Sequence, residues 1–99
     1  MSSGPAITVV VMGYRNEATI VAAVTSVLGQ ETTDPVEVVV VTSGGDGSAA
    51  VVRSAFPELA LVESASRLLP GGARNAGVAA GRGDIVAFLA ADCLAEPGW

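Results

Sequence analysis

The sequence predicts an α/β fold, a three-layer sandwich in which helices cover both faces of a mostly parallel sheet. Two observations support this class. Four short, continuous apolar runs recur along the 99 residues, and the segments between them have helical spacing or helix-forming composition. Continuous β-branched runs are typical of strands buried on both faces, and right-handed crossovers join such strands in parallel. The predicted order is therefore β-α-β-α-β-α-β.

The predicted strands are the four apolar runs themselves: Ile7–Val11, Val36–Val41, Leu59–Val62 and Ile85–Leu89. The first helix is predicted from apolar residues at spacings of three and four, which stack on one helical face: Ile20, Val24, Val27 and Leu28. Gly29 and Gln30 are expected to end it.

The second helix is predicted over Ala49–Ala55, with Ser48 as its N-cap and Pro57 as a block to continuation. The third helix, Ala73–Ala80, is short and rich in alanine, and the segment Gly81–Gly83 ends it.

Composition excludes several classes of chemistry. The chain has no His and no Lys, ten acidic residues and five Arg, for a formal net charge of −5. The absence of His removes Ser–His and Cys–His catalysis and His-bearing metal sites, and the absence of Lys removes Schiff-base chemistry. Because no basic field is present to hold a nucleic-acid backbone, no nucleic-acid partner is expected. Acid–base chemistry would have to come from Asp and Glu.

Cysteine usage and the first apolar segment bear on location. The single Cys93 cannot form an internal disulfide, which fits a reducing compartment. The run Ile7–Met12 is far shorter than the about 20 residues of a membrane span, and no basic segment precedes it. We therefore expect a cytoplasmic protein, with peripheral membrane contact left open. Residues 1–6 are expected to form a leader and residues 7–99 the domain.

In parallel α/β sheets, ligands bind at the carboxyl ends of the strands, so the segments after the strands are the candidate site. After the first strand, Tyr14 offers an aromatic face for a flat ring, and Glu17 would favour the positive N-terminus of the next helix. Asn16 or Thr19 would cap that helix. The alternative is that this segment is only a helix start.

The segment after the second strand, Thr42–Ser48, leaves backbone N–H groups open at a helix start. Gly45, Gly47 and Ala50 also fit the pattern G-x-G-x-x-A. Glu63 lies 18 residues past Gly45, where an NAD-type dinucleotide-binding domain has its ribose ligand. That pattern normally follows the first strand of its domain, whereas here it follows the second. A glycine-rich turn without a ligand is the alternative.

Two charged residues follow the last two strands. Arg74 lies in an otherwise small and apolar helix start, where an unpaired cation is costly. A phosphate fits its planar guanidinium, and an ion pair to Asp84 or Glu63 is the alternative. Asp92 follows the fourth strand, at a usual place for a metal-holding carboxylate in a nucleotide site, or it caps the next turn.

Four stretches, taken in order, resemble family 2 glycosyltransferases, which have the Rossmann-like GT-A fold. Residues 9–20 resemble the family's opening strand and Tyr-Asn-Glu turn, and residues 38–48 resemble its second strand and Asp-Asp-Gly-Ser loop. Gly72–Gly77 resembles its Ala-Arg-Asn-x-Gly stretch, and residues 85–93 resemble the strand that ends in Asp-x-Asp. The resemblance covers about residues 7–99 and concerns the N-terminal, nucleotide-sugar-binding half of the fold.

The resemblance implies transfer of a sugar from a nucleotide diphosphate donor to an acceptor hydroxyl. Tyr14 and Glu17 would line the base and the ribose. Thr42 and Ser43 would lie beside the base, and Arg74 would face the diphosphate. The acceptor is not implied.

The resemblance also implies a divalent metal, Mg²⁺ or Mn²⁺, held by Asp92. The first Asp of the Asp-x-Asp motif is Ala90 here, so we expect weak metal binding. At ~4 Å and an effective dielectric constant of ~20, one lost charge pair is worth on the order of 4 kcal/mol before desolvation. Thr42 and Ser43 replace a pair of Asp, so a nucleotide-binding member without catalysis is an alternative.

The family's catalytic base is an Asp or Glu well downstream of Asp-x-Asp, and nothing in these 99 residues matches it. No catalytic residue is therefore expected in this chain, and the C-terminal acceptor part is expected to be absent. We expect the chain alone not to turn over. An uncovered sheet edge and apolar surface would favour self-association.

Overall fold

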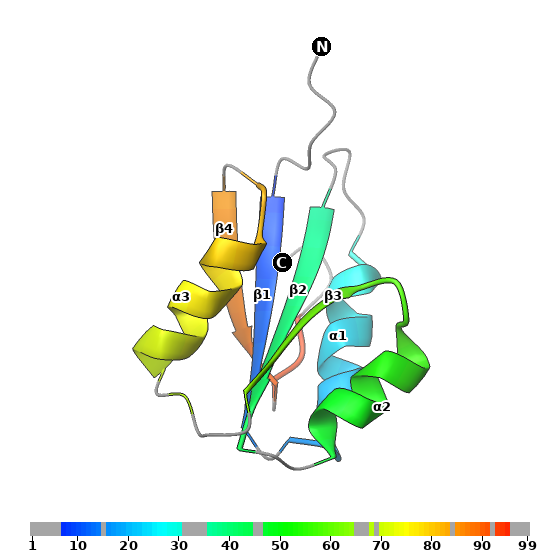
Figure 1. The fold of residues 1–99 in the computed structure, drawn as a ribbon. Coiled ribbons are helices and arrows are strands. Elements are labelled where there is room, and N and C mark those ends of the chain that lie inside the picture. Colours follow the sequence, from blue (N-terminus) through cyan, green and yellow to red (C-terminus); the bar gives the residue numbers. More distant parts are fainter. Residues whose placement is uncertain are drawn as a thin grey trace.

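The computed structural model describes residues 7–14, 16–30, 36–44, 47–64, 68, 70–83, 85–91 and 93–95. Its elements follow the predicted order (Figure 1): β1 (Ile7–Tyr14), α1 (Ile20–Leu28), β2 (Val36–Ser43), α2 (Ser48–Ala55), β3 (Ala60–Ser64), α3 (Pro70–Ala80) and β4 (Ile85–Ala90). The expected leader, residues 1–6, lies outside the described residues. None of the helices formed by the described residues is long and apolar enough to cross a bilayer.

The four strands form one parallel sheet in the order β3-β2-β1-β4. β1 pairs with β2 along its whole length, from Ile7↔Val36 to Tyr14↔Ser43. Because the strands are parallel, their carboxyl ends meet at one edge of the sheet, at the bottom of Figure 1. We call this the carboxyl edge, and the opposite one the amino edge.

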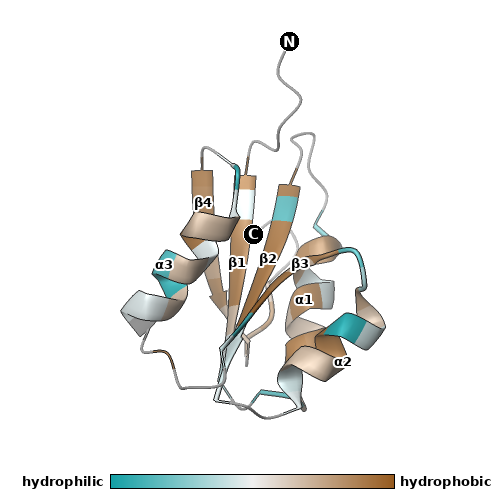
Figure 2. Ribbon diagram, viewed as in Figure 1, coloured by the Kyte–Doolittle hydropathy of each residue, from teal (hydrophilic) through white to brown (hydrophobic). Residues whose placement is uncertain are grey.

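Two apolar cores, one on each face of the sheet, hold the three layers together. One core lies under α1 and α2 and contains Val9, Val24 and Val40. The other lies under α3 and contains Val10 and Ala73. Neighbouring residues of a strand enter opposite cores because side chains alternate across a sheet. Figure 2 shows strands that are hydrophobic along most of their length, as expected of strands covered on both faces.

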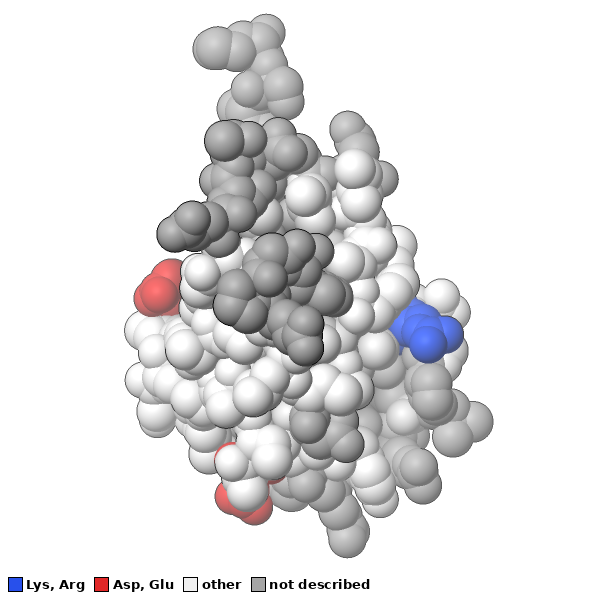
Figure 3. All heavy atoms as spheres, turned by 180° about the vertical axis from the view of Figure 1, so that it is seen from behind, with Lys and Arg blue, Asp and Glu red and all other residues white. Residues whose placement is uncertain are grey.

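The surface carries few charges, since only 15% of the residues are charged. On the face shown in Figure 3, the charged side chains of the described residues lie apart from one another among uncharged ones. The ion-pair or hydrogen-bond partner of each described charged side chain therefore helps to identify the role of that side chain.

The strands run further towards the carboxyl edge than the apolar runs predicted. β1 continues to Tyr14, β2 to Ser43 and β3 to Ser64. Backbone pairing carries them on, since the register Gly13↔Thr42 and Tyr14↔Ser43 continues after the apolar residues end. The prediction that Thr42 and Ser43 belong to the loop after the strand was therefore wrong, because both lie in β2.

The structure differs from three further predictions, all about the helices. Leu28, expected on the buried face of α1, is 48% exposed, and Ala23 is buried. α3 begins at Pro70 instead of Ala73, because the first turn of a helix tolerates the missing N–H of proline. α2 begins at Ser48, so Gly47, not Ser48, occupies the N-cap position.

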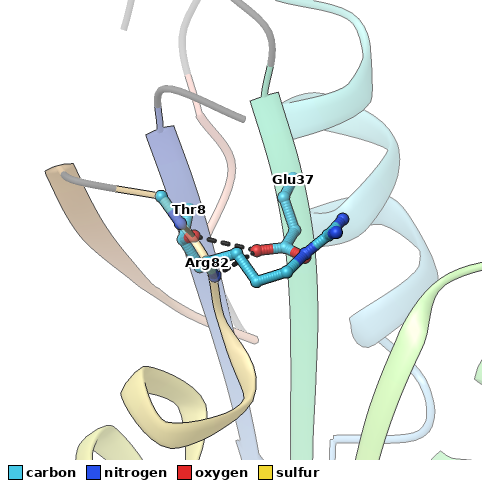
Figure 4. Close-up of polar contacts among 4 residues, drawn as sticks. Thr8, Glu37 and Arg82 are labelled. Atoms are coloured by element: carbon cyan, nitrogen blue, oxygen red, sulfur yellow. Dashed lines mark hydrogen bonds and ion pairs between the residues drawn. The ribbon is translucent and has the colours of Figure 1, made fainter. Parts of the chain in front are cut away.

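A polar cluster joins β1, β2 and the α3–β4 connection at the amino edge (Figure 4). Glu37 Oε1 accepts hydrogen bonds from the Thr8 hydroxyl at 3.0 Å and the Arg82 backbone N–H at 2.8 Å. Arg82 Nε lies 3.3 Å from Glu37 Oε2, and the Gly83 N–H donates to Thr8 Oγ1 at 2.8 Å. Burial alone would raise the pKa of Glu37, but the hydrogen bonds outweigh it and hold the pKa below its usual value of 4.5.

Replacing Glu37 by glutamine is expected to remove an acid-sensitive part of the stability. A carboxylate whose pKa falls on folding stabilises the fold above its unfolded pKa, and this contribution is lost as the pH falls through the folded pKa. Below the usual pKa of 4.5, the wild-type chain should therefore lose stability more steeply than Glu37→Gln. Urea unfolding from about pH 7 down to about pH 3 measures this. The same loss in both proteins would contradict it.

Candidate functional site

The carboxyl edge brings polar side chains of three neighbouring strands into one row. Tyr14 of β1 pairs in register with Ser43 of β2, which pairs on its other side with Ser64 of β3. Tyr14 and Ser43 alternate with the same parity as Val10 and Val41, so they lie on the face covered by α3. α3 also begins at this edge, because the chain must return to the amino edge before β4 starts. The topology thus assembles the predicted site segments at one end of the sheet.

The Tyr14 ring lies against Gly44, in the turn after β2. Gly44 has φ +94°, in the left-handed region that favours glycine. A Cβ at position 44 would come within 2.6 Å of Tyr14 Cε1. Glycine is therefore needed here both for the backbone conformation and for the space that the ring occupies. Tyr14 keeps 37% exposure, so part of the side chain is open to a ligand.

The Glu17 carboxylate lies against Gly47, so close that a Cβ on Gly47 would collide with it. Gly47 is the N-cap of α2, and α2 has no acidic residue in its first turn. A carboxylate at this place interacts favourably with the partial positive charge of a helix N-terminus. We expected Glu17 to favour the start of α1, whereas the structure places it at the start of α2, where it joins the turns after β1 and β2.

Neither Asn16 nor Thr19 caps α1 with its side chain, contrary to the prediction. Thr19 holds the N-cap position without a side-chain capping bond, and its hydroxyl donates to the Ala91 carbonyl at 2.8 Å. Asn16 Oδ1 accepts a hydrogen bond from the Tyr14 N–H at 2.8 Å. These side chains instead stabilise the β1–α1 turn and attach it to the residue after β4.

Thr42 and Ser43 are both buried at the end of β2. They face opposite sides of the sheet, Thr42 towards α1 and α2 and Ser43 towards α3. In the part of the chain that the structure describes, the Thr42 hydroxyl is the buried side-chain group without a hydrogen-bond partner. Such a group costs about 1–3 kcal/mol unless something satisfies it, so Thr42 is a candidate ligand contact.

Two described arginines form ion pairs. Arg53 of α2 pairs with Glu63 at 2.9 Å, and Arg82 pairs with Glu37 at the amino edge. The first pair bears on the dinucleotide-binding interpretation, which needs Glu63 for a ribose. Glu63 already has a cationic partner, which weakens that interpretation.

Arg74 differs from these arginines, because it has no ion pair among the described residues. Its guanidinium carbon lies 5.6 Å from the centroid of the Phe88 ring. The alternative ion pair with Glu63 is not formed, and Asp84 lies outside the described residues. Arg74 therefore lies over the Phe88 ring of β4, near the carboxyl edge. No described carboxylate compensates its charge.

The end of β4 supplies few metal ligands in the described part of the chain. Ala90 is exposed and carries no donor, and Asp92 lies outside the described residues. No three Asp, Glu, Cys or His side chains come together among the residues that are described. The described residues alone therefore do not fit a divalent metal, and such a site would depend on Asp92.

Sequence analysis missed the roles of Gly44 and Phe88. The paired glycines after β2 were a signal for a special turn, but not for the ring packed on it. The apolar run predicts Phe88 only as a strand residue, whereas its contact with Arg74 joins β4 to α3. Nothing in the spacing of a single sequence marks such a pair.

Comparison with known proteins assigns the chain to a family. Glycosyl transferase family 2 matches residues 8–99. The succinoglycan biosynthesis protein ExoO of Rhizobium meliloti (strain 1021) is 38% identical over 94 residues, which are 94% of this chain and 27% of that protein.

Solved structures agree with this assignment. The mannosyltransferase PcManGT from Pyrobaculum calidifontis, in complex with GDP-Man and Mn²⁺, is similar with a TM-score of 0.77 and 32% identity over 94% of this chain and 29% of that chain. S. aureus TarS 1–349 in complex with UDP has a TM-score of 0.68 and 28% identity over 87% of this chain and 27% of that chain. The chain thus spans less than a third of the length of these relatives. The expected GT-A-type α/β fold is confirmed, and the chain belongs to glycosyl transferase family 2.

Proposed function

We propose that this chain binds the nucleotide diphosphate of a sugar donor at the carboxyl edge, with the diphosphate at Arg74 on the face covered by α3. The observation that carries the proposal is Arg74, a cation near that edge with no ion pair among the described residues. A diphosphate supplies the paired oxygens that a guanidinium binds best. Relatives whose structures contain GDP-Man or UDP support this choice of ligand.

The other residues that the sequence predicts for the site would contact the base and the ribose of the nucleotide. Tyr14 offers the exposed part of its ring for stacking on the base, and Glu17, which lies against Gly47 at the start of α2, would contact the ribose. Thr42 and Ser43 end β2, and the base would lie across this strand end. Thr42 offers a buried hydroxyl that lacks a partner within the described part of the chain, and Ser43 would contact the base from the opposite face of the sheet. Charge on the leaving diphosphate grows during sugar transfer, and Arg74 would stabilise it.

A divalent cation would be held by Asp92. A bound Mg²⁺ or Mn²⁺ would supply further positive charge at the diphosphate, as a metal ion does in such sites. The PcManGT complex contains Mn²⁺, which supports this expectation. With Ala90 in place of a second carboxylate, we expect the metal to bind weakly.

In the family, the base for the acceptor hydroxyl is an Asp or Glu well downstream of the Asp-x-Asp position, and we assign no residue of this chain to that role. We therefore expect no turnover by this polypeptide alone. The cytoplasmic location, contact with a membrane surface and self-association through an open sheet edge likewise stay predictions.

Thermal unfolding of the purified chain tests the proposed ligand. UDP and GDP, each with and without Mn²⁺, are compared with NAD. A ligand at 100 times its Kd should raise the free energy of unfolding by about 2.7 kcal/mol. We expect a stabilisation by UDP or GDP that Mn²⁺ increases. A stabilisation by NAD alone would support the dinucleotide-binding interpretation, and no effect of any ligand would contradict the proposed site.

Thr42→Val is expected to move stability and binding in opposite directions. Valine replaces an unpartnered buried hydroxyl with a methyl group, so the free domain should gain about 1 kcal/mol. A nucleotide whose base bonds to this hydroxyl should bind up to about tenfold more weakly. Urea unfolding and nucleotide titration of one preparation measure both effects. A less stable variant would show that the hydroxyl has a partner in the free domain.

A nucleotide-binding member without catalysis is the second candidate, favoured by the exposed Ala90 at the end of β4. Ala90→Asp restores the carboxylate that the family has at this position. If the site is arranged as in the family, this substitution should increase the effect of Mn²⁺ on nucleotide affinity. An unchanged effect of Mn²⁺ would argue against that arrangement.

A further inference from the structure

We propose that Phe88 is a positioning residue that holds the Arg74 guanidinium ready for the diphosphate; this inference rests on the function proposed above. The distance of 5.6 Å from the guanidinium carbon to the ring centroid lies within the ~6 Å range of a cation–π interaction. Phe88 is half-buried and packs against the core under α3, whereas Arg74 is exposed. Because the core holds the Phe88 ring in place, contact with this ring restricts the conformations of the exposed Arg74 side chain.

An aromatic ring suits this task better than a carboxylate. A carboxylate compensates the charge of an arginine and takes its N–H donors, as Glu63 does with Arg53. The ring attracts the cation through the negative face of its π-system and accepts no conventional hydrogen bond. The N–H donors of Arg74 therefore remain available to bind phosphate oxygens in pairs.

The close approach of α3 to the sheet makes the contact possible. Gly77, about one turn after Arg74, lies so near β1 that a Cβ would overlap the Val10 side chain. Val10 pairs in register with Phe88 on the neighbouring strand. Gly77 thus sets the height of the helix over the strand pair from which the Phe88 ring projects.

If Phe88 positions Arg74, removal of the ring should lower the affinity of the chain for the nucleotide. A rotamer-rich side chain that is ordered only on binding lowers affinity by about two- to tenfold. A cation–π contact at an exposed site has a similar size, about two- to fivefold. We therefore expect removal of the ring to weaken the binding of UDP or GDP by about two- to fivefold, without affecting the binding of uridine or guanosine.

The test is a double-mutant cycle. Affinities for UDP and GDP are measured by calorimetry either with or without Mn²⁺, whichever gives the tighter binding to the wild-type chain. Phe88→Leu keeps an apolar side chain and removes the ring, whereas Phe88→Tyr keeps the ring. Phe88→Leu should weaken binding in the wild-type background and have no further effect together with Arg74→Gln. Phe88→Tyr should bind as the wild type does. Val86→Ala, two residues earlier on the same face, is the control for disturbed packing and should leave affinity unchanged.

The outcomes separate this inference from the proposed function. Wild-type affinity in Phe88→Leu, or an equal loss with and without Arg74, would overturn the positioning role. A parallel loss of uridine and guanosine binding, measured by NMR titration, would also overturn it, because general damage to the fold would then explain the result. If the wild-type chain binds neither UDP nor GDP, or Arg74→Gln binds them equally well, the proposed function fails and this inference fails with it.

Discussion

Replacing Arg74 by glutamine is expected to lower the affinity of the chain for UDP or GDP by about ten- to hundredfold. A hydrogen bond from a charged donor contributes about 1.5–3 kcal/mol, and about 1.4 kcal/mol corresponds to a factor of ten. Glutamine keeps an amide donor but loses the charge and the forked geometry, so the loss reports the guanidinium itself. Isothermal titration calorimetry of the two proteins measures the difference.

Arg53→Gln is the matched control for this experiment. Arg53 lies on α2, on the other face of the sheet, and pairs with Glu63. Its replacement removes the same charge from the chain and should leave nucleotide affinity unchanged. Equal effects of the two substitutions would indicate a general electrostatic contribution, and no effect of Arg74→Gln would contradict a diphosphate at Arg74.

Gly77→Ala is expected to destabilise the fold by about 1–3 kcal/mol, although alanine is the better helix former by about 1 kcal/mol. The added Cβ would overlap Val10 Cγ1 and lie within 2.8 Å of Cγ2. Val10 is fully buried and β-branched, so it has little freedom to move aside. α3 must therefore rise from the sheet, which also moves Arg74 away from Phe88. Urea unfolding measures the stability.

Gly71→Ala provides the matched control in the same helix. A Cβ at Gly71 would meet no atom within 4 Å, so this substitution should leave stability unchanged or raise it slightly. A Gly77→Ala variant as stable as Gly71→Ala would show that the helix and sheet can separate at no cost, and would remove the structural basis for the placement of Arg74.

The elements were predictable because the apolar pattern alone determines most of them. Runs such as Val36–Val41 are short and rich in β-branched apolar residues, which favours a covered strand, and the structure places them in the sheet. The strand ends were not predictable, because the polar Thr42 and Ser43 continue β2 through backbone pairing, which hydropathy does not report. Leu28 was misplaced because its helical spacing fits the buried face, whereas it lies in the last turn of α1 and is half exposed.

The place of the site was predictable to the level of the sheet edge. A parallel sheet brings its carboxyl ends together, so Tyr14, Ser43 and Arg74 could be assigned to one end of the molecule. The contacts within the site were not predictable, because each joins residues from different elements. The placement of Glu17 at the start of α2 depends on how two turns pack, which neither turn specifies by itself.

An NMR titration of the ¹⁵N-labelled chain with UDP and GDP, with and without the diamagnetic Mg²⁺, tests the central claim most directly. If the nucleotide binds at the carboxyl edge, the amides of Tyr14, Gly44 and Arg74 should shift with a common affinity. The amides of Thr8 and Arg82 at the amino edge should stay unchanged. Shifts confined to the amino edge, or none at saturating nucleotide, would contradict the account.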